Sequence, residues 1–273
     1  MAQENLISDI KSIRLEDVSI NYNDIGKGEV PIIFIHGFPF DKSTWDPQIK
    51  FFKEDHRIIT YDIRGFGKST AGKKKFEISL FADDLIVLMD SLNIQKAIVC
   101  GLSMGGYIVL NAVTRFPERF SAIILSDTQC IADSIEGKKK RYDTIEKIKS
   151  EGIYEFANGF ISAVFCEKSK AIKKELVESV RTVILSTSKE TIIQTLTALA
   201  ERSETCSMLG NISVPALVIC GKEDKVTPVI QSQSLANNIN GSRLKTVEDA
   251  GHLSNLENSD EFNSAIFDFI SKL

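Results

Sequence analysis

Gly101-Leu102-Ser103-Met104-Gly105-Gly106 is the stretch of this sequence that decides the fold. It follows a short apolar run at 97–100, and a stretch with helical spacing at 105–116 comes after it and stops at Pro117. A residue at a sharp strand-to-helix turn is held in a strained backbone conformation, and only small residues two places before and after it avoid collision. The pattern therefore predicts that the Ser103 hydroxyl stands clear of a sheet, at the N-terminus of a helix.

Short apolar runs rich in β-branched residues recur on both sides of this turn, and stretches with helical spacing such as 79–92 separate them. Near-continuous hydrophobicity is typical of strands that are buried on both faces of a parallel sheet. The alternation predicts an α/β fold whose central sheet is mostly parallel and flanked by helices. The predicted buried strands are 32–35, 58–61, 97–100, 122–125 and 216–220.

Two regions depart from this alternation. Residues 10–22 alternate polar and apolar side chains and end at Asn23-Asp24-Ile25-Gly26, which predicts polar antiparallel strands at one edge of the sheet. From 133 to 210 the strand signal is absent, and the segment is rich in Lys, Glu and Ser with amphipathic stretches of helix length. We expect one domain over 1–273, with a helical cap at 133–210 that is inserted between two strands and covers the sheet as a lid.

Features inside the predicted cap are interpreted as structural. The basic run at 138–141 is short and the chain is acidic overall, which favours a solvated helix face over a binding patch. Phe156 and Phe160 are predicted to belong to the apolar core of the cap.

The composition excludes several classes of protein. Hydrophobic residues make up 43% and charged residues 26%, which is the ordinary mixture of a folded globular chain. With 33 Lys and Arg against 37 Asp and Glu, the net charge of −4 predicts neither a nucleic-acid nor a membrane partner. No run of 18 apolar residues predicts a membrane span, and 1–23 has no pattern of a secretion signal. We expect a cytoplasmic protein.

The cysteines predict neither disulfides nor a zinc site. They are odd in number, scattered and without C-x-x-C spacing, so we expect free thiols and no metal or other cofactor. The five are Cys100, Cys130, Cys166, Cys206 and Cys220.

A serine nucleophile needs a general base with a pKa near neutrality, and the chain has three histidines. His56 lies at the amino end of the strand predicted at 58–61, whereas sites in such sheets lie at the carboxyl ends. His36 is interpreted as a buried structural histidine. His252 follows the strand predicted at 243–247 on a loop with a glycine beside it, and it is the predicted base.

The acid that orients the base is expected between nucleophile and base in chain order. Asp224 follows the strand predicted at 216–220 and is the predicted acid. Glu223 and Asp127 stay open as alternatives, and Asp224 would in a purely structural interpretation cap the helix that begins near Pro228.

Two backbone amides are predicted to form an oxyanion hole. The Met104 N–H lies at the N-terminus of the helix after Ser103, where amides are free and the helix dipole favours negative charge. The second predicted donor is the Phe38 N–H in His36-Gly37-Phe38-Pro39, because Gly37 allows a close approach and Pro39 keeps Phe38 out of helical geometry.

Taken together, these segments resemble the α/β-hydrolase superfamily over residues 30–273 outside the insertion. The resemblance implies the α/β-hydrolase fold and the small capped branch of esterases, enol-lactonases, cofactor-free perhydrolases and carbon–carbon bond hydrolases. Relatives with an aspartate at the position of Ser103 are dehalogenases or epoxide hydrolases, and the serine in this chain argues against both activities. The segments that carry the resemblance are Phe34-Ile35-His36-Gly37-Phe38-Pro39, Tyr61-Asp62-Ile63-Arg64-Gly65-Phe66-Gly67-Lys68-Ser69, Gly101 to Gly106, the Asp224 loop and Gly251-His252.

Within this branch the chain resembles 3-oxoadipate enol-lactonase at 101–106, at 251–257 and within 141–165. The resemblance implies an arginine and a tryptophan just before Phe165, whereas this chain has Ala163 and Val164. An anionic substrate buried under a cap needs a cation, and none is evident at those positions.

The predicted function is that of a serine hydrolase that cleaves a small carboxylic ester or lactone through an acyl-enzyme, with Ser103, Asp224 and His252 as the triad. Two alternatives stay open. One is a low-turnover ligand-binding or signalling protein of the same fold, and the other is a perhydrolase or a carbon–carbon bond hydrolase.

Overall fold

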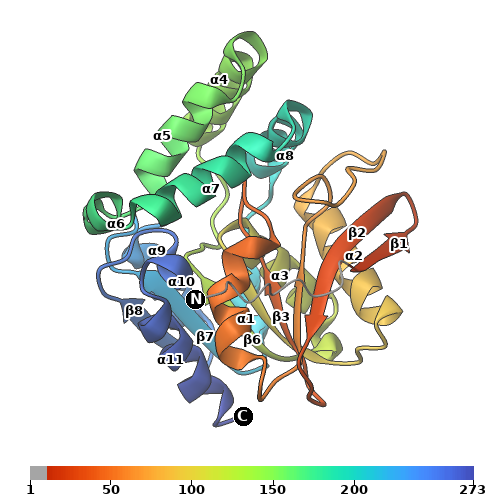
Figure 1. Ribbon diagram of the computed structural model, residues 1–273. Coiled ribbons are helices and arrows are strands. Elements are labelled where there is room, and N and C mark those ends of the chain that lie inside the picture. The colour runs from red at the N-terminus through yellow and green to blue at the C-terminus, as the bar shows by residue number, and fades with distance from the viewer. Residues whose placement is uncertain (1–10) are drawn as a thin grey trace, which may run out of the picture.

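The computed structural model describes residues 11–273, and its centre is a sheet that contains eight strands within this range (Figure 1). The strands lie side by side in the order β1-β2-β4-β3-β5-β6-β7-β8. β1 and β2 are antiparallel to their neighbours, and the pairs from β4 to β8 are parallel. The bounds are β1 Lys11–Leu15, β2 Val18–Ile25, β3 Ile32–Ile35, β4 Ile58–Tyr61, β5 Ala97–Leu102, β6 Phe120–Ser126, β7 Ala216–Gly221 and β8 Arg243–Val247.

The predicted fold class is confirmed, and so is the antiparallel edge as far as the described residues reach. Residue 10, with which the predicted edge segment began, lies outside them. Within β3 the side chains alternate between two cores: Ile33 and Ile35 pack in the cluster that contains α2 (Ile78–Ser91) and α3 (Met104–Arg115). Ile32 and Phe34 pack in the opposite cluster, with α1 (Asp46–Phe52) and α11 (Ser259–Ile270). Burial on both faces explains why the strand is apolar throughout.

The remaining helices complete the two layers and the loops. α1 (Asp46–Phe52) and α11 (Ser259–Ile270) cover one face, and α9 (Val229–Asn238) joins α2 and α3 on the other. Short helical turns lie at Lys42–Trp45, Pro117–Arg119, Cys206–Asn211 and in α10 (Ser254–Glu257). No helix within 11–273 combines the length and the apolarity that a membrane crossing requires.

Five helices lie between β6 and β7 in the chain, in the segment for which a helical cap was predicted. Figure 1 shows them together on one side of the molecule, beyond the strands of the central sheet. Ser134 begins the first of them by accepting a hydrogen bond from the Gly137 N–H, at 3.1 Å. The five are α4 Ile135–Glu151, α5 Tyr154–Val164, α6 Glu167–Ile172, α7 Lys174–Ser186 and α8 Lys189–Glu201.

The expectation that all five cysteines are free thiols is wrong. Cys130 and Cys206 form a disulfide, whereas Cys100, Cys166 and Cys220 are free and buried. The bonded pair is 76 residues apart, with Cys130 before α4 and Cys206 after α8. The fold brings the two ends of the insertion together, and the Thr205 N–H donates to the Cys130 carbonyl at 2.8 Å. Spacing along the chain contains no sign of such a pairing.

Thiol titration of the denatured, unreduced protein should find three reactive cysteines, and reduction should raise the number to five. The double variant Cys130→Ser with Cys206→Ser should lower the free energy of unfolding by about 2–5 kcal/mol, because the disulfide restricts a long loop of the unfolded chain. Five thiols before reduction would show that the pair is not bonded.

Candidate active site

Ser103 occupies the turn between β5 and α3, and its backbone has φ 54° and ψ −112°. This left-handed conformation is uncommon for a residue with a side chain. A Cβ atom at Gly101 would lie 2.3 Å from the Gly105 carbonyl oxygen, and one at Gly105 would lie 2.4 Å from the Ile35 carbonyl oxygen. Both glycines are therefore required where the chain reverses, and the turn leaves Ser103 partly exposed at the carboxyl end of the sheet.

The structure brings Ser103, His252 and Asp224 together from the ends of three strands. The His252 Nε2 atom lies 2.8 Å from Ser103 Oγ, and Nδ1 lies 2.8 Å from Asp224 Oδ2. His252 and Asp224 are almost fully buried, at 1% and 5% exposed. These distances are hydrogen-bonding distances for a hydroxyl, an imidazole and a carboxylate in series.

The loops that carry Asp224 and His252 pack closely on each other. A Cβ at Gly221 would lie 1.9 Å from the Gly251 carbonyl oxygen, so glycine is required there. The Asp224 carboxylate also accepts hydrogen bonds from Val226 N–H at 2.7 Å, and from Thr227 N–H and hydroxyl at 3.0 and 2.8 Å. Asp224 thus orders its own loop and contacts the imidazole. It does not cap α9, because the N-cap residue of that helix is Pro228 and no side chain accepts a capping hydrogen bond there.

Buried charges change the protonation equilibria of the site. Burial disfavours the imidazolium form of His252, but the charge of Asp224 and its hydrogen bond outweigh burial, and the pKa of His252 is raised. Burial alone would raise the pKa of Asp224, but His252 and the Thr227 donors outweigh it, and that pKa is lowered. Asp127, fully buried and close to the charge of Asp224, has a pKa raised to about 7.

The loop after β3 lies against the serine. A Cβ at Gly37 would be 3.1 Å from Ser103 Cβ, so this loop is in contact distance of the nucleophile. Within the part of the chain that the structure describes, neither the Phe38 N–H nor the Met104 N–H donates a hydrogen bond to another protein group. One of these amides directly follows Ser103 and the other belongs to the loop that approaches it, so both are free to donate to an anion.

The other candidates lie outside this chain of hydrogen bonds. His36 is buried, its Nε2 accepts from the Ile63 N–H at 3.0 Å, and burial lowers its pKa, which fits the structural role predicted for it.

His56 precedes β4 at the amino end of that strand. The Glu223 side chain is exposed. Asp127 hydrogen bonds to the Ser254 hydroxyl at 2.5 Å and the Gly221 N–H at 2.8 Å, not to His252.

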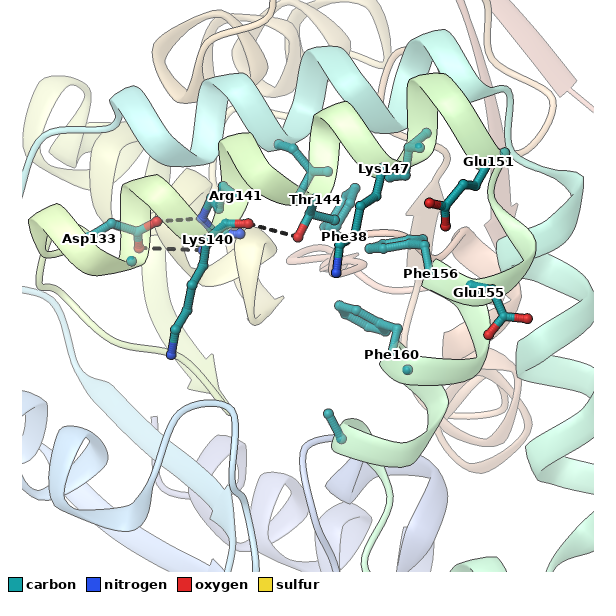
Figure 2. A pocket seen from close by; sticks show the side chains of 16 residues that line it. Phe38, Asp133, Lys140, Arg141, Thr144, Lys147, Glu151, Glu155, Phe156 and Phe160 are labelled. Carbon is teal, nitrogen blue, oxygen red and sulfur yellow. Dashed lines mark hydrogen bonds and ion pairs between the residues drawn. The ribbon is translucent and has the colours of Figure 1, made fainter.

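A cavity of about 720 Å³ lies between Phe38 and the helical insertion (Figure 2). Phe156 and Phe160 of α5, predicted as cap core, line it together with Phe38. The ring centroids of Phe38 lie 6.0 Å from Phe156 and 5.9 Å from Phe160. The cavity therefore has an apolar aromatic wall that includes Phe38, the residue after the glycine that approaches Ser103.

Two residues of the basic run at 138–141, predicted as a solvated face, border the same cavity, and they are Lys140 and Arg141. Lys147 also borders it, about two turns further along α4. Arg141 forms an ion pair with Asp133, which also binds Arg202 at 2.7 Å. Lys140 and Lys147 form no ion pair with any residue in 11–273, and Figure 2 shows both side chains directed from the helix into the open space. The sequence did not predict that these two lysines line a cavity. Which lysines of α4 do so depends on how the helix is rotated relative to the cavity, and the sequence of α4 alone does not show this.

Metal ligation has no candidate site among the described residues, because no three His, Cys, Asp or Glu side chains are grouped as ligands.

Comparison with known proteins places the chain in a family. A family model described as alpha/beta hydrolase fold matches residues 30–259. The chain is 31% identical to 3-oxoadipate enol-lactonase 2 of Acinetobacter baylyi over 93% of its own length and 94% of that protein. It is also similar to a thermophilic esterase from Thermogutta terrifontis, with a TM-score of 0.90 and 30% identity over 96% and 97% of the two chains. The enol-lactonase from Burkholderia xenovorans gives a TM-score of 0.89 at 29% identity, over 96% and 100%. The chain therefore belongs to the α/β-hydrolase-fold family, and it is a hydrolase.

Proposed function

We propose that this hydrolase cleaves a small carboxylic ester or lactone through an acyl-enzyme on Ser103. The observation that carries the proposal is the pair of 2.8 Å contacts that joins Ser103 Oγ to His252 and His252 to Asp224. A serine hydroxyl is a weak nucleophile unless an adjacent base removes its proton as the new bond forms. The relatives named as esterase and enol-lactonases support the choice of ester and lactone bonds.

Acylation begins when Ser103 Oγ attacks the substrate carbonyl carbon and its proton passes to His252 Nε2. The carbonyl π electrons move to oxygen, and the Phe38 and Met104 N–H groups donate to that oxyanion. The Asp224 carboxylate accepts a hydrogen bond from the His252 Nδ1–H, which fixes the orientation of the ring. It also stabilises the imidazolium, because a carboxylate in a low dielectric favours the adjacent positive charge. Asp224 keeps its ionised form throughout this step.

The tetrahedral intermediate collapses when His252 returns its proton to the leaving oxygen and the carbon–oxygen bond breaks. An ester releases an alcohol at this point, whereas a lactone ring opens and its leaving oxygen becomes a free hydroxyl at the far end of the acyl group, which is attached to Ser103 through its carbonyl carbon. Water then attacks the acyl carbonyl with His252 again as the base, and the acid product leaves Ser103 in its starting form.

The helical insertion supplies the wall against which the acyl or alkoxy group packs. Phe156 and Phe160 face the cavity beside Phe38, and an apolar substrate portion would exclude water there as it binds (Figure 2). In this proposal 133–210 acts as a cap, and Ser103, Asp224 and His252 act as the catalytic residues.

Replacement of Ser103 by alanine should abolish turnover of p-nitrophenyl acetate, with a loss on the order of 10³- to 10⁶-fold in kcat. A phosphonate probe should add once to the wild type and not to Ser103→Ala, as intact mass spectrometry would detect. The matched control is Ser162→Ala, which removes an exposed serine of α5 and should leave both results unchanged. Equal turnover by Ser103→Ala and the wild type would rule out the proposed nucleophile.

The pH dependence should have an acid limb set by His252. The imidazole accepts a proton only when neutral, and a raised pKa keeps it protonated to higher pH. The midpoint for kcat/KM should therefore lie above the ordinary histidine value of 6.5. Asp224→Asn removes the charge that raises this pKa, so its residual activity should have a lower midpoint and a kcat lower by about 10³- to 10⁴-fold. A wild-type midpoint at or below 6.5 would contradict the assignment.

A further inference from the structure

Glu257 is a buried carboxylate that binds the backbone on both sides of His252. It lies at the end of α10 and is 2% exposed. Its Oε1 atom accepts from the Gly251 N–H at 2.8 Å and from the Leu253 N–H at 3.3 Å. A buried carboxylate without hydrogen-bond donors destabilises the folded state, so the Glu257 carboxylate is held where these two amides can reach it. The amides are restrained by the same bonds.

The same carboxylate also reaches the helical insertion. Its Oε2 atom accepts from the Cys166 N–H at 2.8 Å. We call residues 164–166, which join the end of α5 to α6, the strap. The strap makes a second contact with the base, because the His252 N–H donates to the Val164 carbonyl at 2.8 Å. Two backbone groups of the insertion are thus bonded to the segment that holds His252.

Gly251 explains how the strap comes so close. A Cβ at this position would lie 2.8 Å from both the Cys166 nitrogen and the Val164 oxygen. A side chain of any size would therefore push the strap away from the His252 loop. The glycine next to the histidine is required by this packing against the insertion, and its backbone needs no positive φ.

We propose that Glu257 is a positioning residue for His252, and that Glu257 and the strap together fasten the helical insertion to the general base. α5 lines the cavity with Phe156 and Phe160 and ends at the strap. A displacement of α5 by a substrate is then transmitted to the imidazole through two backbone hydrogen bonds and one carboxylate. This inference rests on the proposed function in taking His252 as the base.

The charge of Glu257 gives the positioning role a measurable signature. Three carboxylates face His252: Asp224 after β7, Asp127 after β6 and Glu257 of α10. All three favour the imidazolium, and burial opposes them. Removing the Glu257 charge should therefore lower the pKa of His252, which a residue that only supports the fold would not do.

The strap permits a test from the insertion side without touching the site. Cys166 has φ −67° and ψ 161°, and Phe165 before it has φ −96° and ψ 143°. Proline fits at 166 with this φ, and an extended residue before it is the conformation that proline requires. Cys166→Pro removes the N–H that binds Glu257, whereas Cys166→Ala keeps it. Both variants lose the thiol contact to the Ser169 N–H, which makes them a matched pair.

The experiment measures kcat with p-nitrophenyl acetate and amide hydrogen exchange over 247–258 in these two variants. Cys166→Pro should lower kcat by about 10- to 100-fold relative to Cys166→Ala, because misplacement of a catalytic group costs rate steeply. Exchange of the His252 loop should be faster in the proline variant. Equal kcat and equal exchange in the two variants would overturn the proposal.

A second comparison tests the charge by NMR titration of the His252 imidazole. Glu257→Gln should lower the titration midpoint relative to wild type. Glu261→Gln, which removes an α11 carboxylate paired with Lys245, should leave it unchanged. An unchanged midpoint in Glu257→Gln would contradict the role of its charge. Hydrogen exchange and NMR do not require turnover. Absence of ester hydrolysis by the wild type would therefore contradict the proposed function, whereas the positioning role of Glu257 would still be tested by hydrogen exchange and by the NMR titration.

Discussion

The backbone of Ser103, with φ 54° and ψ −112°, is the constraint around which the active site is built. Such a conformation costs on the order of 1–3 kcal/mol and persists only when the surroundings impose it. Here Gly101 and Gly105 pack within the distance that a Cβ would need, and the Ser103 N–H donates to the Ser126 carbonyl at 2.8 Å. The strand β5, the helix α3 and the neighbouring strand β6 therefore hold the serine outside the sheet.

The rest of the site follows from parallel topology. β3, β5, β6, β7 and β8 run in the same direction, so the loops after them meet at one edge of the sheet. Asp127 links three of these loops through its bonds to Gly221 and Ser254. His252 is consequently surrounded by buried carboxylates on several sides, and its protonation responds to all of them. The protonation of the His252 imidazole therefore depends on groups at several strand ends, and not only on its own loop.

Local sequence pattern was sufficient to predict the buried strands and the turn at Ser103. Burial on both faces requires continuous apolar runs, and the turn requires glycine at 101 and 105, so both features can be recognised in the sequence. Local pattern was also sufficient to predict three residues that the fold brings into hydrogen-bonding contact, Ser103, Asp224 and His252, since chain order and strand ends restrict the choice of each residue. The disulfide of Cys130 and Cys206 could not be predicted in this way, because the two residues meet only when the ends of the insertion do. Glu257 was also missed: its partners at Gly251, Leu253 and Cys166 are backbone amides, which carry no residue type.

Under the proposed function, chemistry and substrate choice lie on different parts of this fold, and this separation limits what the resemblance conveys about the substrate. The strand ends contain the hydrogen-bonded serine, histidine and aspartate, whereas the cavity wall comes from the insertion. Ala163 lines the cavity in the region where the resemblance to enol-lactonases implied a larger polar side chain. The cations that border this cavity lie on α4 instead, with Arg141 paired with Asp133, which Arg202 shares, and Lys140 and Lys147 unpaired among residues 11–273. Under the proposed function, a substrate in this cavity would meet a different arrangement of charge from the one the resemblance implied, although the bond to be broken would meet the same groups. The strap and Glu257 are the points at which these two parts touch, so a change in the cavity wall is also a change in the support of His252.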